Sequence, residues 1–111
     1  MRYIANVRNS PEVKRLMIYS GPSGAYLFFY SIEEDGSCDH DLLLESVDDA
    51  MDYAAEEYGL SRDDWQEIDA PLKHCQHDWI APARVPGRET DNPQWGQLEV
   101  LRDGEWVRIT C

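Results

Sequence analysis

Cysteine and histidine side chains occur in two short clusters whose residue types could ligate a metal ion. The first cluster is Cys38 and His40, and the second is His74, Cys75 and His77. Thiolate and imidazole suit zinc, and four such ligands would complete its tetrahedral shell. The C-x-H and H-C-x-H spacings differ from those of the usual structural zinc sites. Zinc binding by Cys38, His40, Cys75 and His77 is therefore one hypothesis. The other is that Cys75 is a small buried apolar residue and the histidines hydrogen-bond to loops.

The same residues could form the site of a small enzyme, with Cys75 as nucleophile and His77 or His40 as base. A reactive thiol needs a nearby positive group or a helix N-terminus to lower its pKa, and the many acids of this chain would raise it instead. The sequence contains no P-loop, dinucleotide fingerprint or nucleophile elbow. We therefore assign no catalytic residue and expect a protein that is not an enzyme.

The acidic residues are concentrated in one third of the chain. Residues 33–67 contain fourteen acids and one base, Arg62, while the chain as a whole has a net charge of −12. The remaining residues are therefore close to neutral. Nucleic acids and anionic membranes are polyanions, so the acidic segment argues against both as partners. It favours attraction to a basic protein surface instead.

Residues 46–58 are predicted to form the main helix. An apolar stripe at a helical period runs along this segment, with polar residues on the other side. Ser46 is a suitable N-cap, and Gly59 supplies the left-handed stop. The stripe consists of Val47, Ala50, Met51, Ala54, Ala55 and Tyr58.

The other face of this helix carries Tyr53 and five acids. We interpret these acids either as a solvated surface or as a contact surface for a basic partner. Glu56 and Glu57 lie at the end of the helix where the dipole disfavours negative charge, so local stability does not account for them. The predicted partner-binding residues are Asp48, Asp49, Asp52, Glu56 and Glu57.

Short apolar segments on both sides of the helix are predicted to be strands. We expect them at residues 3–7, 15–20, 25–32, 41–45, 65–68, 97–101 and 105–110. Residues 21–24 are predicted to form a hairpin turn, and Asp103-Gly104 is typical of a type I′ turn. Ser61 and Asp64 form a capping signature for a short helical turn at 61–65. The predicted fold is α+β, an antiparallel sheet of about five strands with helix 46–58 on one face, against Leu27, Phe29 and Ile18 or Met17.

Residues 69–93 contain four prolines and show no reliable periodicity. Either part of this stretch, such as 78–85, is an edge strand that tolerates Pro82, or the loop is functional. Four tryptophans lie in the second half of the chain, and they suit either a core beneath this loop or a binding groove. They are Trp65, Trp79, Trp95 and Trp106.

The length of 111 residues and an apolar content of 42% predict a single globular domain spanning residues 1–111. The odd number of cysteines argues for a reducing, cytoplasmic location. Met1-Arg2 is followed by no apolar run of signal-peptide length, and the apolar residues 25–30 are too few to span a bilayer. The sequence indicates no oligomeric state.

Three segments together resemble a set of small bacterial proteins of unknown function. They are S-V-D-D-A-M-D-Y-A-A-E-E-Y-G-L, the D-W pair at 64–65, and C-Q-H-D-W-I-A-P. The resemblance runs from about Tyr26 to the C-terminus. It implies a bacterial, stand-alone domain and brings no activity, ligand or catalytic residue with it.

Overall fold

The computed structural model describes residues 1–73, 75–87 and 90–109, and it divides the chain into two compact units. The first unit is Met1–Ala70 and the second is Pro71–Cys111. Each combines secondary structure with a small core of its own, and the predicted α+β class is confirmed. The expectation of a single domain stays a prediction.

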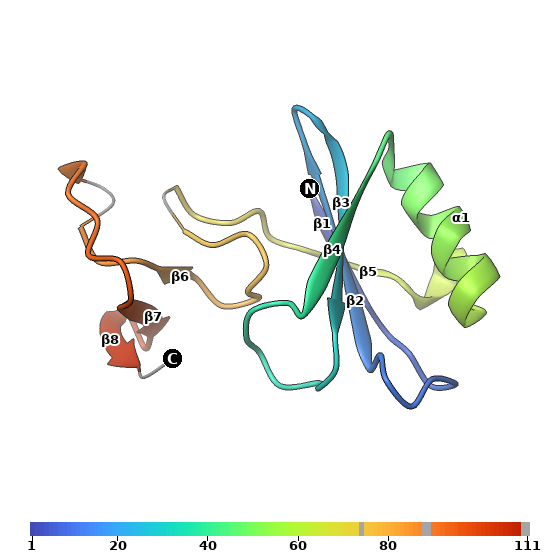
Figure 1. The fold of residues 1–111 in the computed structure, drawn as a ribbon, viewed down its shortest axis with the longest axis horizontal. Helices are drawn as coiled ribbons and strands as arrows, with labels where there is room; N and C mark the ends of the chain where they lie inside the picture. The colour runs from blue at the N-terminus through green and yellow to red at the C-terminus, as the bar shows by residue number, and fades with distance from the viewer. Residues whose placement is uncertain (74, 88–89, 110–111) are drawn as a thin grey trace. The chain divides into compact units, whose positions relative to one another are not determined.

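The first unit is a five-stranded antiparallel sheet with one helix on it (Figure 1). The spatial order of the strands is β4-β3-β2-β1-β5, so β4 and β5 are the two edges. The strands are β1 (Arg2–Asn6), β2 (Arg15–Gly21), β3 (Gly24–Tyr30), β4 (His40–Leu44) and β5 (Gln66–Ile68). The predicted hairpin between β2 and β3 is confirmed, with Gly21 opposite Gly24. β3 lies in the interior of the sheet, since it pairs with β2 and β4.

The main helix α1 (Val47–Tyr58) is capped at both ends as the sequence predicts. The Ser46 hydroxyl accepts a hydrogen bond from the Asp49 N–H at 3.1 Å. Gly59 has a φ of 69° and donates its N–H to the carbonyls of the last turn. This left-handed geometry strains any residue with a Cβ atom, which explains the glycine. The short 3₁₀ helix η1 (Arg62–Asp64) follows, with the predicted capping box between Ser61 and Asp64.

The underside of α1 packs on one face of the sheet. Ala50 and Ala54 are fully buried, and they lie in one cluster with Ile18, Leu27 and Phe29. The odd-numbered positions of β1 point to the same face, as expected from strand alternation. The predicted contact between the helix stripe and the central strands is therefore confirmed, with Ile18 and not Met17 on the helix side.

Two details of the helix prediction are corrected, and the choice between Ile18 and Met17 is resolved. Ala55 is exposed, although it was placed in the apolar stripe. Tyr53, predicted on the polar face, packs against the core with its ring 6.3 Å from that of Phe29. Met17 contacts the Tyr30 hydroxyl at 3.8 Å on the opposite face of the sheet. A long aromatic side chain can reach the core from a position where a short one is left in solvent.

The second unit is built on a three-stranded antiparallel sheet in the order β6-β7-β8. Its strands are β6 (Ala83–Arg84), β7 (Leu98–Arg102) and β8 (Glu105–Ile109). The predicted Asp103-Gly104 turn joins β7 to β8, and both residues have positive φ, at 52° and 80°. The strand expected within 78–85 is reduced to two residues at the edge of this sheet. Thr110 and Cys111 lie outside the described residues.

The tryptophans occupy different environments. Trp65 packs against the core of the first unit, and Trp79 packs against the core of the second. The Trp106 ring lies 3.8 Å from the guanidinium carbon of Arg84, a cation–π contact. Trp95 is 73% exposed. Of the two alternatives, a core accounts for Trp65 and Trp79 but not for the exposed Trp95.

Candidate functional site

The outer face of α1 exposes all five of the predicted partner-binding acids. We call the residues Asp48, Asp49, Asp52, Glu56 and Glu57 the acidic face. The side chains of Asp48 and Asp52 are 81% and 71% exposed, at two positions one helical turn apart. A capped helix packed on a sheet holds these carboxylates on a fixed scaffold. Whether a partner binds them stays a prediction.

One base lies against this acidic face. Arg62, in the turn after α1, places its guanidinium nitrogens 2.7 Å from Asp48 and 3.1 Å from Asp52. The hydrogen bond that the Arg62 guanidinium donates to the Asp48 carboxylate raises the pKa of Arg62. The last turn of the helix contains no basic residue. Arg62 therefore pairs with the N-terminal half of the face, and among the residues that the structure describes no base pairs with Glu56 or Glu57.

The cysteine and histidine clusters do not gather a ligand set in the described residues. Cys38 and Cys75 carry thiols and are half-buried, one in each unit. The His40 ring packs edge-on against Phe29 at 4.2 Å, a contact that accounts for its position in β4. Across residues 1–73, 75–87 and 90–109, no group of three or more His, Cys, Asp or Glu side chains is placed to hold a metal ion. His74 lies outside these residues.

These placements bear on the two hypotheses built on cysteine and histidine. Zinc binding by Cys38, His40, Cys75 and His77 stays a hypothesis. The backbone N–H of Cys75 donates to the Leu72 carbonyl at 3.0 Å, within a turn of the second unit. No observation singles out Cys75 as a nucleophile or His77 as its base.

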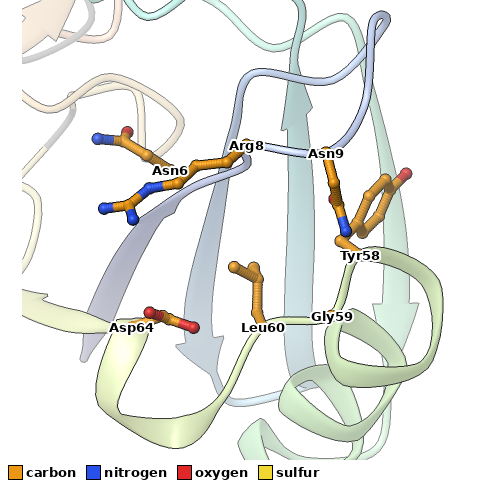
Figure 2. A pocket seen from close by; sticks show the side chains of 7 residues that line it. All are labelled: Asn6, Arg8, Asn9, Tyr58, Gly59, Leu60 and Asp64. Atoms are coloured by element: carbon orange, nitrogen blue, oxygen red, sulfur yellow. The ribbon is translucent and has the colours of Figure 1, made fainter.

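A shallow pocket of ≈ 330 Å³ opens at the C-terminal end of α1. Its lining is Asn6, Arg8, Asn9, Tyr58, Gly59, Leu60 and Asp64. Figure 2 shows Asn9 beside Tyr58 on one side of the pocket, and Arg8 reaching over the side where Asn6 and Asp64 lie. Burial raises the pKa of Tyr58, and Tyr53 and nearby acids add to the shift.

The pocket can offer hydrogen-bond donors to a small polar group. Within the described residues Arg8 forms no ion pair, so its guanidinium is available, with the amide of Asn6 beside it and the amide of Asn9 on the other side of the pocket (Figure 2). The Asp64 carboxylate is already used, since Oδ2 accepts from the Ser61 N–H at 2.7 Å. The sequence analysis missed this pocket because the end of β1 meets the end of α1 only in the folded chain. No local motif marks it.

No family model, curated protein or solved structure matches the chain. The inferences about function therefore depend on the residues of the chain itself. None of the helices in the described residues has both the length and the apolar character needed to cross a membrane.

Proposed function

We propose that this chain is a non-enzymatic protein-binding module of the inhibitor, immunity or adaptor type. Its acidic face, on the outer side of α1, binds a basic surface of another protein. The observation that supports this most strongly is the exposure of all five acids on the helix, where Arg62 is the one base paired with them in the described part of the chain. A surface that carries charges of one sign creates an electrostatic field, which steers an oppositely charged partner toward it and raises the rate of association.

The positions of the acids along α1 favour a role in binding over a role in stabilising the helix. Asp48 and Asp49 lie in the first turn, where the helix dipole favours negative charge. Glu56 and Glu57 lie in the last turn, where the dipole disfavours it, and no base compensates them. Acids placed against the dipole cost stability, so a role outside folding explains them better.

The half-buried thiols support a cytoplasmic location for this module. Thiols persist in reducing compartments, whereas oxidising compartments favour disulfides. We include this location in the proposal.

The test compares capture by two variants that have lost the same amount of charge. The helix variant is Asp52→Asn, Glu56→Gln and Glu57→Gln, which keeps the shape of each side chain. The matched control is Asp69→Asn, Asp91→Asn and Glu105→Gln, three exposed acids outside the acidic face. Each protein is immobilised and exposed to native lysate at low and at high ionic strength.

We expect the wild type and the control variant to retain the same basic protein at low salt and release it at high salt. The helix variant should not retain it. If both variants lose capture of the basic protein equally, net charge alone determines binding and the acidic face has no special role. Capture that does not change with salt concentration would also contradict the proposal.

A further inference from the structure

The edge strand β4 (His40–Leu44) carries a further feature that the proposed function leaves unexplained. It is a terminal strand of the five-stranded sheet, paired with β3 on one side. Residues 40–43 are exposed, and Leu42 and Leu43 are 38% and 54% exposed. An edge strand presents a row of backbone N–H and C=O groups that can pair with another chain.

The opposite edge of the same sheet is protected, and β4 is not. β5 (Gln66–Ile68) has three residues, and Gln66 and Glu67 are both exposed. A short, polar edge discourages pairing. β4 has five residues with three consecutive leucines, so it is longer and more apolar. This contrast within one sheet identifies β4 as the edge suited to strand addition.

Two apolar rows run across the sheet and end at β4. On the helix side, Ile18 lies opposite Leu27, which lies opposite Leu42. On the other side, Tyr26 lies opposite Leu43. Consecutive strand residues point to opposite faces, so an added strand with apolar residues at its centre would extend both rows.

The charges near β4 determine which strand can be added. Asp39, Asp41 and Glu45 lie at or beside the strand, and the acidic face of α1 follows directly in the chain. A second copy of this chain would bring these acids against their equivalents, and like charges opposite each other are destabilising. Acids therefore protect this edge from its own copies, but they attract a basic strand.

We propose that β4 binds an extended segment of the partner protein, apolar at its centre and basic at both ends, by strand addition. The backbone hydrogen bonds supply affinity, and the flanking bases meet the acids of β4 and α1. This inference rests on the proposed function, because the added segment belongs to the basic partner. It specifies how that partner is held.

The test uses a synthetic peptide with a Val-Ile-Val centre and lysines at both ends. The control peptide has the same sequence with alternate backbone amides N-methylated, which keeps charge and side chains but blocks strand pairing. Binding is followed by NMR of the protein at low ionic strength, about 10 mM, where the screening length is ~30 Å. We expect shifts and slower amide exchange at residues 40–44, and affinity for the N-methylated peptide reduced by about tenfold or more.

A pair of protein variants completes the test. Leu43→Lys places a positive charge on the edge, and Ile32→Lys places the same charge at a site of matching exposure, 56% against 54%. Leu43→Lys should weaken peptide binding by about tenfold, whereas Ile32→Lys should change it by less than about twofold. Both are surface positions, so both variants should fold.

Three results would overturn the inference. Equal binding of both peptides with shifts confined to α1 would remove strand addition and leave the proposed function intact. Dimers of the free protein with protected amides in β4 would assign the edge to a second copy. Absence of binding by either peptide, in a protein that still captures its partner from lysate, would place that partner elsewhere on the surface.

Discussion

Ala54 and Ala55 are neighbours in α1 and have opposite environments. Ala54 is fully buried against the sheet, whereas Ala55 is exposed. The same contrast holds along the helix, between an underside that packs and an outer face that carries acids. The underside is determined by the shape of the core. Arg62 pairs with Asp48 and Asp52 on the outer face, and core packing does not determine the composition of that face.

The largest expected effect comes from placing a charge on each face. Ala54→Asp buries a carboxylate with no partner, which should lower the free energy of unfolding by about 3 kcal/mol or more. Ala55→Asp should lower it by only about 0.5–1 kcal/mol, since it changes helix propensity and adds one exposed charge. Urea unfolding followed by circular dichroism measures both. Equal losses at the two positions would contradict the packing of α1 described above.

A smaller effect on the free energy of unfolding is expected to differ in sign between the two ends of the acidic face. Glu57→Lys places a cation where the helix dipole favours it, and should raise the free energy of unfolding by about 0.3–1 kcal/mol. Asp48→Lys makes the same change in charge in the first turn and should lower it by about 0.3–1 kcal/mol. Thermal unfolding at low salt measures both variants, and the difference should shrink as salt is added. The same sign at both ends would show that net charge dominates over the dipole.

The helix ends and turns could be predicted because their signals are local. Ser46 and Gly59 each act on backbone groups within a few residues, and Asp103-Gly104 forms a turn by itself. The helix stripe was predicted correctly at Ala50 and Ala54 but not at Ala55. Alanine is small enough for either environment, so it carries little information about its face.

Features that depend on distant parts of the chain could not be predicted. Tyr53 reaches the core because Phe29 lies beneath it, and Arg8 lines a pocket because β1 ends beside α1. Strand order is equally non-local, and without it β4 could not be recognised as an edge. The acids of the outer face were all correctly expected at the surface, since the helical period alone places them there. Their role in binding stays a prediction.

The smallest expected effect on stability tests whether Arg62 masks the acidic face. Arg62→Gln removes the one base that pairs with Asp48 and Asp52, and Arg8→Gln makes the same change in charge at an exposed arginine without an ion pair. Exposed ion pairs contribute little to the free energy of unfolding, so the urea midpoints of both variants should stay close to that of the wild type.

The affinity for a basic peptide should distinguish the Arg62 variant from the Arg8 variant. Removing Arg62 leaves both carboxylates available, so the affinity for an oligolysine peptide at low salt should rise roughly two- to fivefold more than in Arg8→Gln. An equal rise in the two variants, measured by isothermal titration calorimetry, would mean that the peptide responds to total charge. The acidic face would then be an ordinary solvated surface.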